Sequence, residues 1–337
     1  MRYEDAGVNI RLAESITENI KKIAGRTRND RVVLGIGAFG AGYSFGVDDI
    51  LVSSTDSVGT KVLIAAMANQ HSGIGEDIVN HCVNDILCQG AEPLFFMDYI
   101  ASGALLKETI IQLVEGMAKA CAALGIPLAG GETAEMPDVY QPGAYDLAGF
   151  IVGRVSRKRL IDGTRIREGD VLLGLPSSGL HTNGYSLVRK VVFELSGIRV
   201  DDWVEELGTT VGNALLKTHR CYYGPVSAVL KSFNIHGIVH ITGGGFRSNI
   251  GRVLPKGLAA VVDTRGWQPP PLFGWLQRTG SIGSDEMYST FNMGVGMILI
   301  LSPEDLGGVK AELGALGEQP YWVGKIVKGE GGVELAR

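Results

Sequence analysis

A carboxylate, a hydroxyl and an ammonium group lie close together in the segment Ser54-Thr-Asp-Ser-Val-Gly-Thr-Lys61. Asp56 is expected at the end of a strand, and Gly59, Thr60 and Lys61 at the start of a helix. This combination of groups suits Mg²⁺ and phosphate. The alternative is a helix N-cap followed by an ordinary first turn, which the segment taken alone favours.

A helix predicted over Gly75–Cys88 has an apolar side formed by Ile78, Val79, Cys82 and Ile86. Its other side carries four polar residues at i, i+4 spacings, Asp77, His81, Asn84 and Asp85. Exposed helix faces usually carry Lys and Glu pairs, and this one has none. Short carboxylates and an amide fit metal coordination, with a solvated helix face as the alternative.

A third acidic residue, Glu132, comes directly after Gly130 and Gly131, which follow a short predicted strand at Pro127–Ala129. Its carboxylate is therefore expected to reach the same pocket as Asp56 and Asp85. Two or three acids can hold one or two Mg²⁺ ions that bridge triphosphate oxygens.

Two loops in the second half of the chain carry histidines. The loop Pro176–Gly184 presents His181 where α/β folds keep their chemistry, although a lone loop histidine is more often merely solvated. The segment from His240 to Phe246 predicts a strand end, three glycines (Gly243, Gly244 and Gly245) and a helix start. Such a turn either binds an anion or is simply a tight strand–helix connection.

The glycines Gly35, Gly37 and Gly40, with Asp56 further on, imitate a dinucleotide-binding fingerprint. Only the residues 41–49 separate Gly40 from the next predicted strand, too few for a parallel crossover with its helix. A flexible loop that covers phosphates remains, with a plain surface loop as the alternative. The sequence contains no GxxxxGK[ST] motif, so an ATP-binding protein would need another phosphate cradle.

The periodicity predicts an α/β protein with two domains, 1–160 and 161–337, divided by the charged stretch near Arg157–Gly169. In the first domain we expect a helix over 107–124 and strands at Ile50–Thr55, Leu94–Ala101 and Leu147–Val155. The last strand is apolar on both faces, which calls for helices on one side and a subunit partner on the other. In the second domain we expect a strand starting at Val171, and further helices and strands at Gly184–Leu195, Tyr223–Phe233, Ile238–Ile241, Phe246–Val253, Leu258–Val262 and Val295–Leu301.

The composition excludes several classes of protein. The 337 residues carry a net charge of −5 with dispersed Lys and Arg, so the sequence shows no basic cluster of the kind that binds nucleic acid or an anionic membrane. The N-terminus lacks a signal-peptide core, and the longest apolar run is too short to span a bilayer. The four cysteines form no CxxC pair, and Cys82 and Cys121 fit core positions. We therefore expect a cytoplasmic protein.

Taken together, the chain resembles the phosphoribosylformylglycinamidine cyclo-ligase (AIR synthetase) family over nearly its whole length. The resemblance rests on nine collinear blocks: YEDAGVNI (3–10), GIGAFG (35–40), STDSVGTK (54–61), CVNDILCQGAEPLFFMDY (82–99), AGGETAEMP (129–137), YDLAGFIVG (145–153), GLHTNGYSLVR (179–189), HITGGGF (240–246) and EMYSTFNMGVGM (286–297). Ala38 and Thr182 stand where Gly and Ser are commoner, and neither change removes a charge or a ligand.

The resemblance implies a homodimer in which the N-terminal sheets form a shared barrel, and an ATP-dependent closure of an imidazole ring in purine synthesis. On this basis Asp56, Asp85 and Glu132 are expected to bind Mg²⁺. Lys21 and the loop with Gly35, Gly37 and Gly40 are expected at the ATP phosphates, with Thr60 and Lys61 as weaker candidates. His181 is expected at the substrate amide, with Asp85 and His240 as further catalytic candidates. The ribose phosphate is expected at Asn183, Gly243, Gly244 and Gly245.

Two alternatives stay open at this stage. One is another ATP-using member of the same superfamily, of the selenophosphate synthetase or thiamine-monophosphate kinase type. The other is a homologue that binds nucleotide without catalysis, which the joint presence of Asp56, Asp85, Glu132 and His181 argues against.

Overall fold

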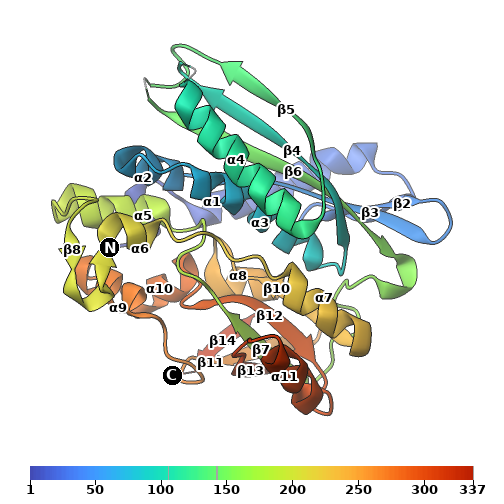
Figure 1. The fold of residues 1–337 in the computed structure, drawn as a ribbon. Helices are drawn as coiled ribbons and strands as arrows, with labels where there is room; N and C mark the ends of the chain where they lie inside the picture. The colour runs from blue at the N-terminus through green and yellow to red at the C-terminus, as the bar shows by residue number, and fades with distance from the viewer. Residues whose placement is uncertain (105, 142, 337) are drawn as a thin grey trace.

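The computed structural model describes residues 1–104, 106–141 and 143–336; the side chains of residues 10, 11 and 14 lie outside this description. Two six-stranded sheets form the framework, one from each half of the chain (Figure 1). This architecture confirms the predicted α/β class. The sheet changes between Ser156, which ends one strand, and Val171, which begins the next.

The first sheet has the strand order β1-β2-β3-β6-β4-β5. These strands are β1 (Val32–Leu34), β2 (Ala41–Phe45), β3 (Asp49–Ser57), β4 (Glu92–Ser102), β5 (Leu128–Glu135) and β6 (Tyr145–Ser156). All neighbours are antiparallel except β4 and β5. The residues after Gly40 therefore form an antiparallel strand, which confirms that no dinucleotide-binding crossover exists there. The strand predicted at 127–129 is longer than expected and includes Gly130, Gly131 and Glu132.

Helices α3 (Ser72–Leu87) and α4 (Lys107–Leu124) confirm two of the three helices predicted in this half, and α4 matches its predicted bounds. They pack on one face of the first sheet (Figure 1). Their backbones come so close that a Cβ added at Gly116 would lie 1.9 Å from the Ser72 carbonyl oxygen. A glycine is therefore required at this crossing.

In the part of the chain that the structure describes, the opposite face of the first sheet carries exposed apolar side chains. Leu147, Ile151 and Val155 of β6 are buried, as predicted, but Phe150 on the other side of the strand is 41% exposed. The neighbouring outer positions Met97 and Tyr99 of β4 are exposed as well. Strand β6 was predicted to be covered by helices on one face and by a subunit partner on the other. Within a single chain, one face of this strand is buried and the other is partly exposed.

The second sheet has the order β10-β12-β7-β13-β11-β14. Its strands are β7 (Val171–Pro176), β10 (Ile235–His240), β11 (Leu258–Asp263), β12 (Val295–Leu301), β13 (Tyr321–Lys328) and β14 (Val333–Ala336). The helices are α5 (Tyr185–Arg189), α6 (Val211–Leu215), α7 (Tyr223–Ser232), α8 (Gly245–Gly251), α9 (Pro271–Thr279), α10 (Ser284–Thr290) and α11 (Leu306–Ala315). The helix predicted over 184–195 is α5 followed by a π-helical stretch, Lys190–Leu195.

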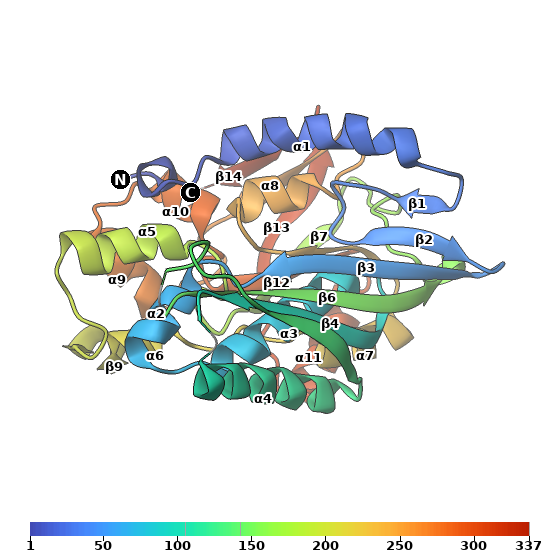
Figure 2. The same cartoon turned by 90° about the horizontal axis from the view of Figure 1, so that it is seen from above.

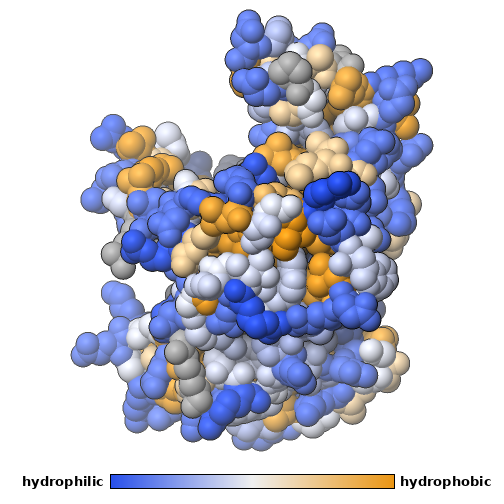
Figure 3. Space-filling model, turned by 90° about the vertical axis from the view of Figure 1, so that its left-hand side faces the viewer, coloured by the Kyte–Doolittle hydropathy of each residue, from blue (hydrophilic) through white to orange (hydrophobic). Residues whose placement is uncertain are grey.

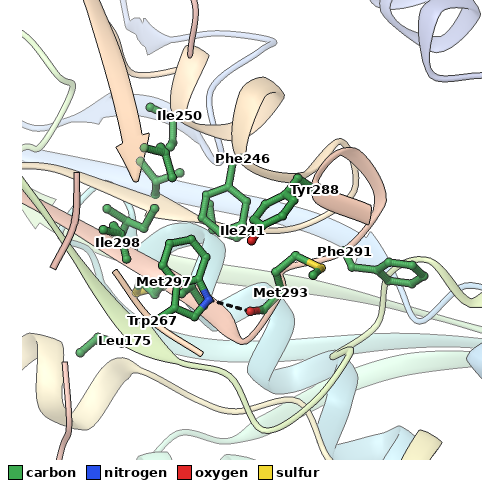
Figure 4. Close-up of a cluster of buried hydrophobic side chains, with 14 of the residues drawn as sticks. Leu175, Ile241, Phe246, Ile250, Trp267, Tyr288, Phe291, Met293, Met297 and Ile298 are labelled. Carbon is green, nitrogen blue, oxygen red and sulfur yellow. Dashed lines mark hydrogen bonds between the residues drawn. The ribbon is translucent and has the colours of Figure 1, made fainter. Parts of the chain in front are cut away.

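An aromatic cluster fixes the start of α8, directly after the three glycines. The rings of Phe246, Trp267 and Tyr288 lie within 5.6–6.3 Å of one another, measured between centroids (Figure 4). The Trp267 indole N–H donates to the Met293 carbonyl oxygen at 2.8 Å. Since Phe246 is fully buried, the glycine turn that precedes it has a fixed position.

Helix α1 (Ile10–Ala24) runs along the outside of the molecule beside α8, as Figure 2 shows, whereas α2 (Lys61–Ala68) follows β3. Among the described residues, no helix combines the length and apolar character needed to cross a membrane. The side shown in Figure 3 carries apolar residues in small groups among polar ones.

Candidate active site

The polar side of α3 faces the second half of the molecule and is buried there. Asp77, His81, Asn84 and Asp85 are all at most 6% exposed, so the alternative of a solvated helix face is wrong. Two of them contact the segment between α6 and α7: Asp77 accepts the His219 backbone N–H at 2.6 Å, and Asn84 accepts that of Tyr222 at 2.9 Å. We call this buried region between the two halves the seam.

Asp85 and His240 form a pair at the centre of the seam. Asp85 Oδ1 lies 2.9 Å from His240 Nδ1, and Ser54 Oγ donates to Asp85 Oδ2 at 3.1 Å. A carboxylate at Nδ1 makes that nitrogen the N–H and leaves Nε2 with its lone pair. The pair therefore fixes the orientation and tautomer of His240, which is the last residue of β10.

A second carboxylate–imidazole pair joins β3 to α3. His81 Nε2 lies 2.8 Å from Asp56 Oδ2, and the Asp56 side chain is 39% exposed. Burial opposes protonation of His81, but the carboxylates of Asp56 and Asp85 prevail and raise its pKa to about 9. Burial also acts against the charge of Asp56, yet His81 holds the pKa of that carboxyl below its usual value.

His219, which no sequence motif had marked, completes a group of four imidazoles with His81, His181 and His240. Its ring stacks on that of His181 at 4.0 Å and 18°, and its Nε2 lies 3.1 Å from His240 Nε2. Burial lowers the pKa of His181, His219 and His240, so these three are neutral at pH 7. Spacing could not reveal His219 because its neighbours in the cluster are far away in sequence.

His181 is fully buried, which contradicts the alternative of a solvated loop histidine. It adopts a φ of 63°, an uncommon conformation for a residue other than glycine. The Ser178 backbone N–H donates to His181 Nε2 at 3.3 Å, and Nδ1 has no hydrogen-bond partner among the described residues. Gly296 makes room for the ring, because a Cβ there would lie 2.5 Å from His181 Cε1.

Lys61 does not lie where it could bind a phosphate. Its ammonium is fully buried, 2.7 Å from Asp77 Oδ2, and donates to the Lys217 carbonyl oxygen at 2.8 Å. The expectation for Lys61 is corrected accordingly: its charge compensates a buried carboxylate. Thr60 is half-buried, and its hydroxyl lies 3.1 Å from that of Ser186.

Glu132 is also apart from the other two acids. It is exposed and pairs with Tyr99 of β4, whose side chain belongs to the uncovered face of the sheet. Asp56 pairs with Gly149 on the covered face. Since cross-strand partners share a face, Glu132 and Asp56 point to opposite sides of the sheet. Within one chain the three acids do not meet, and only Asp56 and Asp85 are brought together.

A cavity of about 860 Å³ brings the two glycine loops together beneath α1. It is lined by Lys21, Gly37, Gly243, Gly244 and Arg252, among others. A Cβ on Gly37 would lie 2.9 Å from Lys21 Cε, so the lysine extends directly over the loop. Arg252, at the end of α8, was not predicted from the sequence.

The other predicted glycines have different surroundings. A Cβ on Gly40 would meet Val52 Cγ1 at 2.9 Å, and one on Gly245 would lie 1.9 Å from the Tyr288 carbonyl oxygen. Both are packing glycines, and neither they nor Gly35 line the cavity. Asn183 does not line the cavity but lies beside Gly243, which does, and Asn183 Nδ2 has no hydrogen-bond partner among the described residues.

Solved structures of other proteins share this fold. A thiamine-monophosphate kinase from Stenotrophomonas maltophilia superposes with a TM-score of 0.64 at 19% identity, covering 94% of this chain and 95% of that chain. AaThiL in complex with AMPPCP and TMP gives a TM-score of 0.65 at 14% identity, covering 94% and 91%. At these identities the similarity is one of fold.

Sequence comparison is more specific. The domains described as AIR synthase related protein, N-terminal and C-terminal, match residues 30–155 and 167–336. A phosphoribosylformylglycinamidine cyclo-ligase from Thermoanaerobacter pseudethanolicus is 48% identical over 99% of this chain and 100% of its own length. The corresponding protein from Alkaliphilus oremlandii is 45% identical over 97% of each. The chain therefore belongs to the phosphoribosylformylglycinamidine cyclo-ligase family.

Proposed function

We propose that this protein closes the imidazole ring of aminoimidazole ribonucleotide, using formylglycinamidine ribonucleotide and ATP and releasing ADP and phosphate. The observation that carries the proposal is the cavity in which Lys21 and Gly37 face the turn of Gly243 and Gly244. That turn begins three residues after His240, so an anion-binding surface adjoins the buried pair of His240 and Asp85. The volume of the cavity, about 860 Å³, lies within the range of small-molecule sites.

The cavity suits phosphate groups. Lys21 and Arg252 supply positive charge, and the backbone N–H groups of the two glycine loops can approach phosphate oxygens closely. The Lys21 ammonium is held 2.7 Å from Glu18 on the exposed side of α1, so it can exchange this weak partner for a phosphate. We assign the ATP and ribose phosphates to this cavity without dividing it between them.

Asp56 fits a Mg²⁺ ligand because it is the half-exposed carboxylate of the site. Both carboxylates have a partner on each oxygen, but Asp85 is buried against His240, which fits the positioning of that histidine better than metal binding. Bound with ATP, Mg²⁺ would neutralise charge on the phosphate oxygens. We assign Mg²⁺ binding to Asp56 and not to Glu132.

Ring closure requires that the formyl amide oxygen become a leaving group. The γ-phosphoryl group passes from ATP to that oxygen and ADP leaves; the amidine nitrogen then attacks the same carbon, and phosphate departs with the oxygen. The attacking nitrogen loses a proton, which a neutral imidazole can accept. We assign proton transfer at the amide to the neutral pair of His181 and His240, with Asp85 orienting the latter.

The direct test is an ADP-release assay with formylglycinamidine ribonucleotide as the only acceptor. We expect one ADP and one aminoimidazole ribonucleotide per turnover, and no ADP without the acceptor. The same assay with thiamine monophosphate tests the kinase alternative. Release of ADP only with thiamine monophosphate would replace the proposed reaction, and ATP binding without release would indicate the non-catalytic alternative.

The role of His181 can be separated from ATP binding. His181→Ala should lower kcat for ring closure by about 10²–10⁴-fold, the usual contribution of a proton-transferring group. The Kd for ATP, measured by calorimetry without the second substrate, should stay within about threefold of the unaltered protein, since His181 does not line the cavity. A collapse of ATP affinity with modest loss of kcat would contradict the assignment.

We further propose that the protein is a cytoplasmic homodimer joined through the uncovered face of the first sheet. Tyr43, Phe45, Met97, Tyr99 and Phe150 are all exposed on this face. An apolar sheet face of this kind marks an interaction surface. Sedimentation at micromolar concentration should give a dimer, and Phe150→Arg should give monomers; a monomeric unaltered protein would contradict this assembly.

A further inference from the structure

A cavity of about 650 Å³ lies where the two halves of the chain are joined, and we call it the linker cavity. One wall comes from the segment 158–165, which belongs to the connection between β6 of the first sheet and β7 of the second. The other walls are the end of α3 with the residues that follow it, and α7 with the start of β10. The linker cavity shares no lining residue with the cavity beneath α1, so a ligand in one would not occupy the other.

Positive charge is concentrated in the linker cavity. Its lining includes one acidic residue, Glu92, and four cationic ones, Lys158, Arg159, Arg165 and Lys231. Within the described ranges of the chain none of these cations forms an ion pair, whereas Glu92 is paired at 3.5 Å with Arg154, which lies outside the lining. The ends of α3 and α7 contribute negative partial charge of about half a unit each. The four cations outweigh these contributions, so the cavity favours an anion although the whole chain has a net charge of −5.

Arg165 is held at the linker cavity by neutral partners. Its Nη1 donates to Asn234 Oδ1 at 2.7 Å, and its Nη2 donates to the Leu160 carbonyl oxygen at 3.4 Å. A guanidinium group has five N–H donors, so three of them have no protein partner in the part of the chain that the structure describes. The side chain is partly buried, and its charge has no carboxylate beside it. Arg165 is therefore a positioned donor for the oxygens of a phosphate group.

The linker cavity also has apolar walls, which a free phosphate ion would not use. Three aliphatic side chains of the lining are at most 3% exposed: Leu87, Ile161 and Ile235. Two aromatic rings, those of Tyr223 and Phe233, are partly buried in the lining. Aromatic rings of this kind stack on nucleobases. The volume of the cavity lies within the range of small-molecule sites.

We propose that the linker cavity is a second nucleotide-binding site, in addition to the site of the ATP that is consumed in the reaction. The phosphates of this nucleotide are bound by the cationic side chains, with Arg165 as the positioned donor, and its base lies against Tyr223 or Phe233. Inorganic phosphate would satisfy the cations alone, and an uncharged molecule would satisfy the apolar walls alone. A nucleotide satisfies both.

A nucleotide in the linker cavity would contact both halves of the chain close to the seam. Leu87 lies in α3, two residues after Asp85, and Tyr223 follows Tyr222, whose backbone N–H is bound by Asn84. None of the histidines of the seam lines the cavity. The bound nucleotide would therefore stabilise the folded protein through contacts with both halves, without contact with the proposed proton-transfer residues.

Calorimetric titration of the full-length protein with ADP, without ribonucleotide, tests the site independently of the reaction. We expect two ADP molecules per chain. Arg165→Gln should weaken the binding of one of them by about 10–100-fold, because it removes a charged hydrogen bond to a phosphate, and should leave the Kd of the other within about threefold. The matched control is Arg167→Gln, which removes the same charge from an exposed residue of the same connection that does not line the cavity. This control should leave both Kd values unchanged.

A second titration, with pyrophosphate, separates a nucleotide site from a phosphate site. ADP should bind the linker cavity at least about tenfold more tightly than pyrophosphate, and Tyr223→Leu should reduce this preference, because base stacking on an aromatic ring is lost. Equal affinity for the two ligands, equal weakening by Arg165→Gln and Arg167→Gln, or ADP binding that depends on Lys21 alone would each overturn the proposal. If Arg165→Gln weakens ADP binding and Lys21→Ala does not, the linker site stands while the phosphate site of the proposed reaction fails.

Discussion

The seam and the cavity, although adjacent, are built in opposite ways. In the seam the charged and imidazole groups are buried and held by named protein partners, as Asp85 is held by His240 and Ser54. In the cavity, Lys21 and Arg252 reach out from the protein surface, and the remaining lining is mostly loop backbone and small side chains. The groups of the seam are thus held by buried partners within the protein, whereas the cavity's Lys21 has the exposed Glu18 as its ion-pair partner. Substitutions in the seam should affect kcat and stability, and those in the cavity should affect ligand affinity.

The largest expected effect comes from Asp85→Asn. An amide beside His240 Nδ1 can donate a hydrogen bond, which would favour the other tautomer and move the proton to Nε2. We expect kcat to fall by about 10²–10⁴-fold with the fold retained, measured as ADP release and by circular dichroism. The matched control is Asp170→Asn, because Asp170 also lies buried beside a histidine, His236, but away from the site. A near-normal kcat in Asp85→Asn would remove the pair from the mechanism.

A large loss of stability is expected from Lys61→Met. The substitution leaves Asp77 buried without its cation, which typically costs about 3–5 kcal/mol of unfolding free energy. Urea denaturation should show this loss, while the KM for ATP in the folded fraction should change little.

The double variant Lys61→Met with Asp77→Asn serves as the control. The amide that replaces the Asp77 carboxylate is neutral and could still accept the His219 backbone N–H, so most of the stability should return. If Lys61→Met instead raises the KM for ATP more than tenfold without destabilising the protein, Lys61 belongs to the phosphate site after all.

The pair of His81 and Asp56 predicts a pH-dependent contribution to stability. The pKa of His81 rises from 6.5 to about 9 on folding, which corresponds to at most about 3 kcal/mol, since Asp56 is partly screened by solvent. Because the folded pKa is the higher one, the contribution is complete below pH 6.5 and disappears as the pH rises to 9. The difference in unfolding free energy between the unaltered protein and His81→Gln should therefore shrink between these pH values. A constant difference would show that His81 is not charged.

The sequence predicted part of the regular elements and the two glycine turns of the cavity, whereas β2, β13, β14, α1, α9 and α11 were not predicted. Each correct prediction rests on a local signal: the steps of four and three residues from Ile110 through Val114, Met117 and Cys121 to Leu124 in α4, or the glycines that precede the buried Phe246. The polar side of α3 was also recognised as unusual from its residue types alone. What these local patterns could not show is which surface each element meets.

Three differences follow from that limit. Asp77 turned out to be the partner of Lys61, which precedes it by 16 residues, because α2 and α3 bring the two together. Glu132 was expected just beyond a short strand, with its carboxylate in the pocket of Asp56 and Asp85, but β5 continues to Glu135 and places it on the uncovered face of the sheet. His219 lies in a segment without a motif, and only the packing of the second half against α3 places it beside His240.

The smallest effect, and the one that tests the cavity itself, is expected from Lys21→Ala. Losing one charged hydrogen bond to a phosphate costs about 1.5–3 kcal/mol, which corresponds to a rise of about 10–100-fold in the KM for ATP or ribonucleotide. Lys22→Ala is the matched control: it removes the same charge from the next residue of α1, which is exposed and does not line the cavity. Stability should be unchanged in both variants, because neither side chain is buried. If both variants weaken ligand binding equally, the effect is one of overall charge, and the cavity is not a specific binding site. If only Lys21→Ala weakens binding, the ligand is bound in the cavity beneath α1, next to the seam.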